Sequence, residues 1–277
     1  METKTKQLKK NLLTWYKKNN RSFNWRHTND PWKILLIEII SQQTQIDRAN
    51  TYYQKFIKKF PTPESMSRSS LKTILKMWSG LGYNNRAIRL HESSKLIAEK
   101  GFKNIYPNFE SLPGVGQYTK NAILSFAYGD KVLALDTNLE RVLTRYFAID
   151  STKDYVKKYS RFLLAGVKSR DLNQALMDLG SSICTSSNPK CDICPLEKSC
   201  KKYILKSKNS IEKFKGSNRE LRGMIIKLLL VKDQIAVKDI VNETSEDEEK
   251  IITAINSLKG DGLLRIRKNN IIEINPN

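Results

Sequence analysis

The sequence has no cysteine before residue 184, only two histidines, and no long apolar run. Four cysteines in one short stretch are too few and too clustered to cross-link a chain of 277 residues. No segment approaches the roughly 20 uninterrupted apolar residues that a membrane helix needs. The basic N-terminus also lacks the apolar block and cleavage site of a signal peptide. We therefore expect a soluble, cytoplasmic protein with no membrane partner.

Histidine and strand signals are equally scarce. Neither His27 nor His91 has a partner at metal-ligand spacing, so both are expected to be structural or surface residues. Strand patterns are almost absent before residue 216, whereas helical periodicity is strong. It predicts helices over residues 4–18, 32–60 with an interruption near Ser41, 70–78, 85–99, 117–128, 137–147, 153–166 and 171–183. The first 216 residues are therefore expected to form an all-α domain.

The pattern changes after a largely polar, Lys- and Ser-rich stretch at residues 206–216, which we interpret as a domain boundary. Beyond it, helices are expected over residues 219–231, 236–242 and 245–259. A β-hairpin should follow, with strands at 263–267 and 271–274 joined by an Asn-Asn turn. Three helices and a hairpin are typical of a winged-helix-like (α+β) domain at 217–277.

Acidic residues are too few to balance the basic ones, and the net charge is +21. The excess lies in residues 1–216, because the ten basic and ten acidic residues of 217–277 cancel. A balance this basic predicts a polyanionic partner, bound with release of counterions. A general lysine surplus is the alternative, and charge alone does not choose between DNA, RNA and an acidic membrane.

The cysteines stand at Cys184, Cys191, Cys194 and Cys200, with the spacing Cys-x6-Cys-x2-Cys-x5-Cys. Four thiolates in one stretch can surround a single inorganic centre. Structural zinc sites usually pair two Cys-x2-4-Cys knuckles, whereas the outer gaps here are six and five. The spacing therefore favours a [4Fe-4S] cluster over zinc. Two disulfides are the remaining alternative.

The segment Leu112–Thr119 has the pattern of a phosphate-binding hairpin. Gly114 and Gly116 permit a tight turn and a close approach of backbone to a ligand. Gln117 then opens a helix, whose unpaired N–H groups and positive dipole end accept a phosphate. This is the signature of a helix-hairpin-helix, which grips the DNA backbone without reading its sequence. An ordinary interhelical turn is the alternative.

Two carboxylates are candidates for acid–base chemistry. Glu38 lies in an otherwise aliphatic run, residues 34–40. Burial there should raise its pKa and allow it to act as a general acid near neutral pH. An edge position or an ion pair with a basic residue is the alternative. Asp136 precedes the helix expected at 137–147 and is a natural N-cap, a role that needs only one of its oxygens.

The polar run that follows Glu38 is also a candidate binding segment. Gln42, Gln43 and Thr44 interrupt the apolar helix with amide and hydroxyl groups that can donate to and accept from base edges. A solvated stretch of helix is the alternative.

In order and spacing, these motifs resemble the helix-hairpin-helix DNA glycosylases, and among them the adenine DNA glycosylase (MutY) family. The resemblance covers residues 1–205. The matching motifs are Trp25-Arg26, residues 37–45, Gly80–Tyr83, Leu112–Thr119, Leu135–Asn138, Asn173–Gly180 and the four cysteines. The cysteine spacing is shared with endonuclease III relatives, whereas Gln42-Gln43-Thr44 points to adenine.

The resemblance implies a base-excision-repair enzyme that acts on double-stranded DNA, as a monomer, and removes adenine mispaired with guanine or 8-oxoguanine. Glu38 would protonate N7 of the extruded adenine, and Asp136 would stabilise the oxocarbenium-like sugar. Tyr118 and Asn138 would complete the catalytic group. Tyr118 stands where bifunctional relatives carry a Schiff-base lysine, so a monofunctional glycosylase is expected, with weak strand cleavage through Lys120 left open.

The resemblance also implies a set of DNA-contacting residues and a layout of lobes. Arg26 would lie near the base pocket, and the gap left by the extruded base would be filled by Gln43, Thr44 and Tyr83. Further DNA contacts are implied for Gln42, Gly114, Gly116, Gln117 and Lys120, with a monovalent cation at the hairpin. Residues 24–135 would form a helical barrel, and residues 1–23 with 136–205 the iron–sulfur lobe.

The chain departs from the family in several places. Glu140 stands where a basic residue is common, and Thr137 where glycine is common. The family's C-terminal domain, similar to nucleotide pyrophosphohydrolases, helps to recognise 8-oxoguanine, and the winged-helix-like tail stands in its place here. The preference for 8-oxoguanine over guanine is therefore left open. Because the tail is neutral, we favour a stabilising or protein-binding role for it, with the partner unknown.

Two other functions are compatible with parts of the pattern. A thymine or uracil glycosylase acting on T:G or U:G pairs would share the scaffold, but its relatives replace Gln42-Gln43-Thr44. An iron–sulfur DNA-binding regulator would read DNA through the winged helix. The helix expected at 245–259 begins with a run of acidic residues, which disfavours that second alternative.

Overall fold

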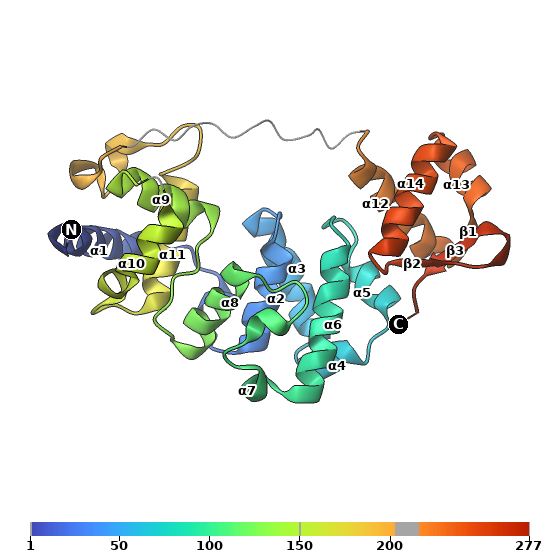
Figure 1. Cartoon of the computed structure of the whole chain (residues 1–277), viewed down its shortest axis with the longest axis horizontal. Coiled ribbons are helices and arrows are strands. Elements are labelled where there is room, and N and C mark those ends of the chain that lie inside the picture. Colours follow the sequence, from blue (N-terminus) through green and yellow to red (C-terminus); the bar gives the residue numbers. More distant parts are fainter. Residues whose placement is uncertain (1, 150, 203–215, 277) are drawn as a thin grey trace. The chain divides into compact units, whose positions relative to one another are not determined.

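The computed structural model describes residues 2–149, 151–202 and 216–276. The chain is mostly helical, and a three-stranded sheet lies near its C-terminus (Figure 1). This confirms the expected fold class, an all-α protein with a small α+β tail. The predicted boundary at 206–216 lies almost entirely outside the described residues. None of the described helices is long and apolar enough to cross a membrane.

The predicted helices before the tail are confirmed in place and approximate length. The helices are α1 (Glu2–Asn19), α2 (Pro31–Ser41), α3 (Ile46–Lys59), α4 (Pro63–Ser67), α5 (Leu71–Trp78), α6 (Asn85–Lys100), α7 (Phe102–Ile105), α8 (Gln117–Ile123), α9 (Thr137–Phe147), α10 (Thr152–Leu164) and α11 (Ser169–Ser182). The sequence did not predict α4 and α7, because a helix of one turn is too short to show a period. The end of the helix expected at 117–128 is a π-helical turn, η3 (Leu124–Tyr128).

The chain divides into two compact units, each built from separate segments. Unit 1 comprises Met1–Glu38, Pro107–Glu110 and Val115–Lys208, and unit 2 comprises Ile39–Tyr106, Ser111–Gly114 and Asn209–Asn277. Interleaving of this kind was expected, but the particular lobe boundaries at residues 23 and 135 stay a prediction.

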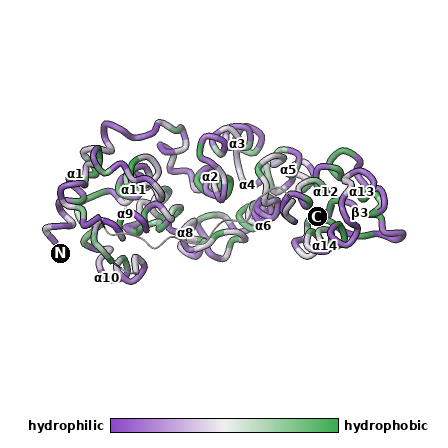
Figure 2. The backbone as a smooth tube through the Cα atoms, turned by 90° about the horizontal axis from the view of Figure 1, so that it is seen from above, coloured by the Kyte–Doolittle hydropathy of each residue, from purple (hydrophilic) through white to green (hydrophobic). Residues whose placement is uncertain are grey.

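The core of unit 1 joins segments that are far apart in the sequence. Leu8 and Leu12 of α1 are fully buried in one cluster with Leu143 of α9 and Leu176 of α11. Hydrophobic and hydrophilic residues alternate along these helices (Figure 2), as amphipathic packing requires. Each fully buried leucine contributes about 1.5–3 kcal/mol. The N-terminal helix is therefore held by residues more than a hundred positions further along the chain.

The tail has the predicted winged-helix-like composition. Its elements are α12 (Asn218–Lys232), β1 (Gln234–Ala236), α13 (Val237–Thr244), α14 (Glu248–Gly260), β2 (Leu264–Ile266) and β3 (Ile271–Ile274). The antiparallel sheet has the strand order β1-β3-β2. Asn269 and Asn270 both adopt positive φ, at 62° and 54°, which is why an Asn-Asn pair suits this tight turn. The short strand β1 was not predicted.

We expect Leu12→Ala to lower the free energy of unfolding by about 2–5 kcal/mol, because it leaves a cavity in the core of unit 1. Thr14→Ala, an exposed position two residues on in the same helix, is the matched control and should change stability by less than about 0.5 kcal/mol. Urea denaturation measures both. Equal stability of the two variants would show that α1 is not part of this core.

Candidate active site and cysteine site

The helix α2 carries Glu38 in a setting that excludes water. The Asp30 carboxylate accepts a hydrogen bond from the backbone N–H of Trp32 at 2.9 Å and fixes the start of the helix. The aliphatic residues at positions 34–37, 39 and 40 are each at most 2% exposed. A helix that is apolar on every side is buried, and the Glu38 side chain is buried with it, at 8% exposure.

The pKa of Glu38 is raised to about 7, chiefly by burial, and the nearby negative charge of Asp136 contributes in the same direction. A hydrogen bond with the Tyr118 hydroxyl acts in the opposite direction, because it stabilises the ionised form. The pKa of Tyr118 lies well above its ordinary value, first because of burial and then because of the two carboxylates. The structure therefore brings Glu38, Tyr118 and Asp136 together, with a carboxyl that is half protonated near pH 7.

Asp136 is the N-cap of α9, as expected. Its Oδ1 accepts from the backbone N–H of Leu139 at 2.7 Å. Its Oδ2, which takes no part in capping, accepts from the Asn138 side-chain amide at 2.8 Å. Both oxygens of the Asp136 carboxylate are therefore held in place by donors. Asn138, the fourth predicted catalytic residue, thus contacts Asp136 directly.

Arg141 holds Asn138 in place, and sequence reasoning missed it. Its Nη2 donates to the side-chain oxygen of Asn138 at 2.7 Å and to the carbonyl of Gly180 at 2.6 Å. Its Nε donates to the carbonyl of Cys184 at 2.6 Å. A Cβ at Gly180 would lie 2.6 Å from the Cβ of Asn138, so only glycine permits α11 to approach α9 this closely. The signal available in the sequence was a glycine inside a helical pattern.

The next turn of α9 contacts the cysteine segment. Arg145 donates to the carbonyls of Thr185 at 2.6 Å and Ser186 at 3.0 Å, and its Nη1 lies 3.4 Å from Sγ of Cys184. One helix therefore begins at Asp136 and, over its next turns, fixes the first cysteine.

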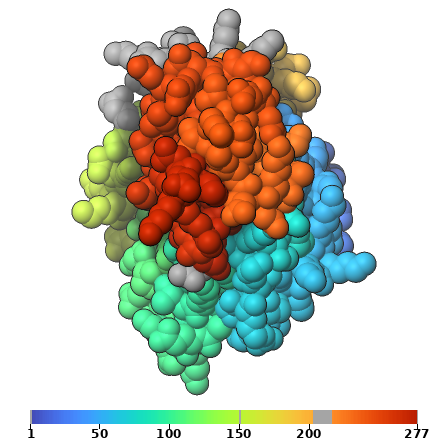
Figure 3. All heavy atoms as spheres, turned by 90° about the vertical axis from the view of Figure 1, so that its right-hand side faces the viewer, coloured from blue at the N-terminus to red at the C-terminus, as the bar shows by residue number. Residues whose placement is uncertain are grey.

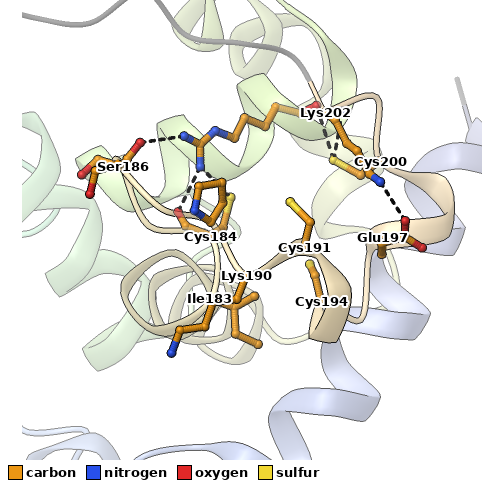
Figure 4. Close-up of a pocket in the computed structure, with 12 residues that line it drawn as sticks. Ile183, Cys184, Ser186, Lys190, Cys191, Cys194, Glu197, Cys200 and Lys202 are labelled. Atoms are coloured by element: carbon orange, nitrogen blue, oxygen red, sulfur yellow. Dashed lines mark hydrogen bonds and ion pairs between the residues drawn. The ribbon is translucent and has the colours of Figure 1, made fainter.

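The four cysteines surround one cavity of about 290 Å³, which Arg145, Lys190 and Lys202 also line (Figure 4). All four thiols are free, which contradicts the disulfide alternative. In the described part of the chain, no three Cys, His, Asp or Glu side chains are arranged to hold one metal ion. A cavity lined by four free thiols has the set of donor atoms that iron–sulfur clusters use.

The pKa of Cys194 is raised to about 11, chiefly by burial, and the other three thiols contribute in the same direction. The pKa of Cys200 is raised for the same reasons. Such thiols stay protonated at neutral pH unless a cationic centre stabilises their ionised form, so binding a metal centre here would release protons.

In unit 2, the buried guanidinium of Arg86 organises two loops, and this residue was also missed from the sequence. It donates, at 3.0–3.2 Å, to the backbone carbonyls of Ile39, Ile40, Leu81 and Gly82. It also donates to the carbonyl of Gln42 and, at 3.3 Å, to the hydroxyl of Thr44. These hydrogen bonds satisfy the carbonyls at the C-terminal end of α2, which have no N–H donor from a following helical turn. Arg86 therefore ties the polar segment 42–44 to the loop that carries Tyr83.

The hairpin at 112–119 depends on one glycine rather than two. Gly114 has a φ of 81°, and a Cβ there would lie 3.1 Å from the Cβ of Arg89. Its carbonyl accepts from the Gln42 amide at 3.3 Å. Gly116, in contrast, has a φ of −89° and open space around a Cβ, so the fold of the protein itself does not require glycine there, and its predicted close approach to DNA stays a prediction. Gly116 is the N-cap of α8 and caps it with no side chain.

Three further predicted contact residues have partners within the protein. Arg26 forms a buried, two-pronged ion pair with Asp178, with oxygen–nitrogen distances of 2.6 and 2.7 Å. Lys120 pairs with Glu110 at 2.7 Å. The Gln117 amide donates to Asn121 at 2.9 Å. Arg26 therefore joins η1 (Asn24–His27) to α11, and any DNA contact by these residues stays a prediction.

Residues 36–165 match the family described as "HhH-GPD superfamily base excision DNA repair protein". The chain is 40% identical over 202 residues to the adenine DNA glycosylase of Buchnera aphidicola subsp. Baizongia pistaciae, which covers 70% of this chain and 57% of that protein. It is 32% identical over 235 residues to the adenine DNA glycosylase of Mycobacterium tuberculosis, which covers 79% of this chain and 77% of that protein. The chain thus spans little more than half the length of the Buchnera relative.

The structure is similar to that of a thermostable thymine-DNA glycosylase, with a TM-score of 0.67 and 32% identity over 73% of this chain and 97% of the other. An endonuclease III–DNA complex shares the fold, with a TM-score of 0.59 and 22% identity over 72% of this chain and 96% of the other. The glycosylase-type architecture therefore covers about three quarters of the chain and, in both cases, nearly all of the solved relative.

The raised pKa of Glu38 predicts a pH-dependent stability. A carboxyl whose pKa rises from its ordinary 4.5 to about 7 on folding contributes stability below pH 4.5 that is lost as the pH rises through 7. Glu38→Gln cannot ionise, so relative to the wild type it should gain about 2–3 kcal/mol between pH 5 and pH 8.5. Thermal unfolding at several pH values, with the exposed Glu64→Gln as control, measures this. If the difference in stability between Glu38→Gln and the wild type were the same at every pH, Glu38 would not be a buried acid with a raised pKa.

Proposed function

Because the chain belongs to the adenine DNA glycosylase family of the HhH-GPD superfamily, we propose that it excises adenine mispaired with guanine or 8-oxoguanine from double-stranded DNA. The observation that carries this proposal is the buried Glu38. It has a pKa of about 7 and interacts with Tyr118 and the Asp136 carboxylate. One carboxyl with a pKa near neutral pH and a second carboxyl beside it can divide acid and anion roles.

In the proposed reaction, the adenine nucleotide leaves the base stack, because its reacting atoms are unreachable inside the duplex. Adenine is a poor leaving group as an anion. Glu38 donates its proton to N7, so the electron pair of the breaking N9–C1′ bond goes to a base that leaves uncharged.

The positive charge that develops on the sugar needs a nearby anion. Asp136 supplies it, with each oxygen held by a donor, Leu139 N–H or the Asn138 amide. Such preorganised charge stabilises a transition state without the cost of reorganising solvent. A water oxygen then bonds to C1′ and gives up a proton, which restores the proton that Glu38 lost. The products are free adenine and an abasic site.

Tyr118 makes the proposed enzyme monofunctional. A phenol with a pKa well above its ordinary value cannot form a Schiff base with the sugar. The other candidate for such chemistry, Lys120, is engaged with Glu110 at 2.7 Å. Hydrolysis without strand cleavage is therefore the expected outcome.

The four cysteines would hold a [4Fe-4S] cluster, which supplies metal–thiolate bonds that fix the loop between α11 and residue 200. Lys190 and Lys198 on that loop would then be ordered for contact with DNA phosphate. The monovalent cation at the hairpin, the monomeric state and a cytoplasmic location are further parts of the proposal.

Thymine release from T:G pairs is the second candidate function. It is favoured by the 32% identity to the thermostable thymine-DNA glycosylase over 97% of that chain. The segment Gln42-Gln43-Thr44 favours adenine, since the thymine and uracil glycosylases on this scaffold replace these residues.

Single-turnover base release on duplexes containing A:8-oxoguanine, A:G, T:G and U:G should be fast for adenine only. Glu38→Gln should lower the rate by about 10²–10⁴-fold while duplex binding remains, because only the proton donor is lost. Above pH 7 the wild-type rate should fall about tenfold per pH unit, as Glu38 ionises. Glu64→Gln should match the wild type. Retained turnover in Glu38→Gln would mean that another acid is used.

Purified protein should be brown and absorb broadly in the blue, with about four iron atoms per chain. Cys194→Ser should lose iron and colour. Ser187→Ala, which changes the same cavity without removing a thiol, should keep both. A colourless wild-type protein that contains zinc would contradict the cluster.

A further inference from the structure

The loop from Ser79 to Tyr83 is a rigid platform. The carbonyl of Ser79 accepts from the Tyr52 hydroxyl at 2.6 Å, and that of Gly82 accepts from the Trp78 indole at 3.0 Å. Arg48 bonds to the carbonyl of Gly80, and Arg86 to those of Leu81 and Gly82. With four consecutive carbonyls held in this way, the loop has little freedom left.

The same loop presents an aromatic ring. Gly80, Gly82 and Tyr83 all have positive φ, at 94°, 70° and 47°. For tyrosine that conformation is strained, and strain of this kind persists only where the surroundings impose it. The Tyr83 ring is 38% exposed. The backbone contacts thus hold a large aromatic side chain outward.

The tail supplies a partner for this ring. The Arg219 guanidinium of α12 lies 5.1 Å from the centroid of the Tyr83 ring, and it donates a hydrogen bond to the ring's hydroxyl. A second link, between Lys72 of α5 and Asp233 at the end of α12, holds the other end of the helix. Figure 1 shows α12 beside α5, and in Figure 3 the surface of the tail meets the segment that contains α5.

A groove of about 910 Å³ lies between α12 and this loop. Its charged lining consists of four cations against two carboxylates, Glu220 and Asp261, and the second of these is paired with Arg222. Asn84, Asn85 and Asn218 add amides, and Leu75 and Met224 add apolar surface. Cations for phosphates, amides for base edges and an aromatic ring for stacking are the components of a nucleic-acid-binding groove.

We propose that this groove binds a DNA strand of the substrate duplex and that Arg219 is a positioning residue, which orients Tyr83 toward that strand. The proposal rests on the proposed function, because that function supplies the duplex. It also differs from the stabilising or protein-binding role that the neutral charge of the tail favoured. Charges act over about one Debye length, roughly 8 Å. The excess of positive charge in the groove therefore matters more for DNA binding than the zero net charge of the whole tail. The acidic residues at 246–249 do not line it.

The test measures duplex affinity in full-length protein that carries Glu38→Gln, so that catalysis does not enter. Fluorescence anisotropy gives Kd for an A:8-oxoguanine duplex across a range of salt concentrations. Arg219→Ala should weaken binding about 5–20-fold and reduce the slope of log Kd against log salt by about 1. Lys227→Ala, an exposed change in the same groove, should lower the slope similarly with a smaller loss of affinity.

The matched control is Arg161→Ala. Arg161 is an exposed arginine of unit 1, stacked at 4.7 Å on the Phe162 ring, so the control removes the same charge and the same kind of contact at a residue that does not line the groove. It should leave Kd and slope unchanged. An Arg219→Ala variant with wild-type Kd and slope would overturn the groove as a DNA site. Tighter binding by that variant would overturn it too, because the contact would then compete with DNA.

The positioning role has its own readout. Tyr83→Phe keeps the ring but removes the hydroxyl that accepts from Arg219. If Arg219 acts through Tyr83, the losses of affinity in the two single variants will not add in the double variant. Additive losses would show that Arg219 acts independently of the ring. If the wild-type protein released no base, only the proposed function would be overturned. The groove would still be tested, because the affinities are measured in a variant that does not need to release the base.

Discussion

The exclusion of water from the Glu38 carboxyl is the constraint on which the rest of the proposed chemistry depends. A helix that is apolar on all sides carries the acid into the core, and the same burial that raises its pKa would destabilise the protein if no hydrogen-bond partner were present. Tyr118 is that partner. Asp136 has the opposite environment, at the start of a helix with two donors. The two carboxyl groups are therefore chemically similar but lie in different environments.

Helix α9 links this acid–anion pair to the cysteine segment. It begins at Asp136, Arg141 supports Asn138 and the carbonyl of Cys184, and Arg145 contacts the Cys184 thiol. A change in the order of the cysteine segment therefore has a direct physical route to the carboxylate, through two arginine side chains and one amide. The close approach at Gly180 removes the space in which this connection could relax.

The sequence allowed much of the fold to be predicted, because periodicity and turn chemistry are local. The long helices, the Asn-Asn turn and the N-cap at Asp136 all follow from neighbouring residues. Arg86 and Arg141 could not be found in this way, because each collects carbonyls from segments up to 47 positions away. The same applies to Arg26, whose partner Asp178 lies 152 positions along the chain. The sequence identified polar residues, but only the structure identified their partners.

The burial of α1 has a consequence for biosynthesis. Leu8 and Leu12 leave the ribosome before their neighbours on α9 and α11, which are translated more than a hundred residues later. Domains often fold from the N-terminus as they emerge, but unit 1 cannot close its core in that order. Helix α1 must therefore wait as a nascent amphipathic segment until α11, which ends at Ser182, has been made.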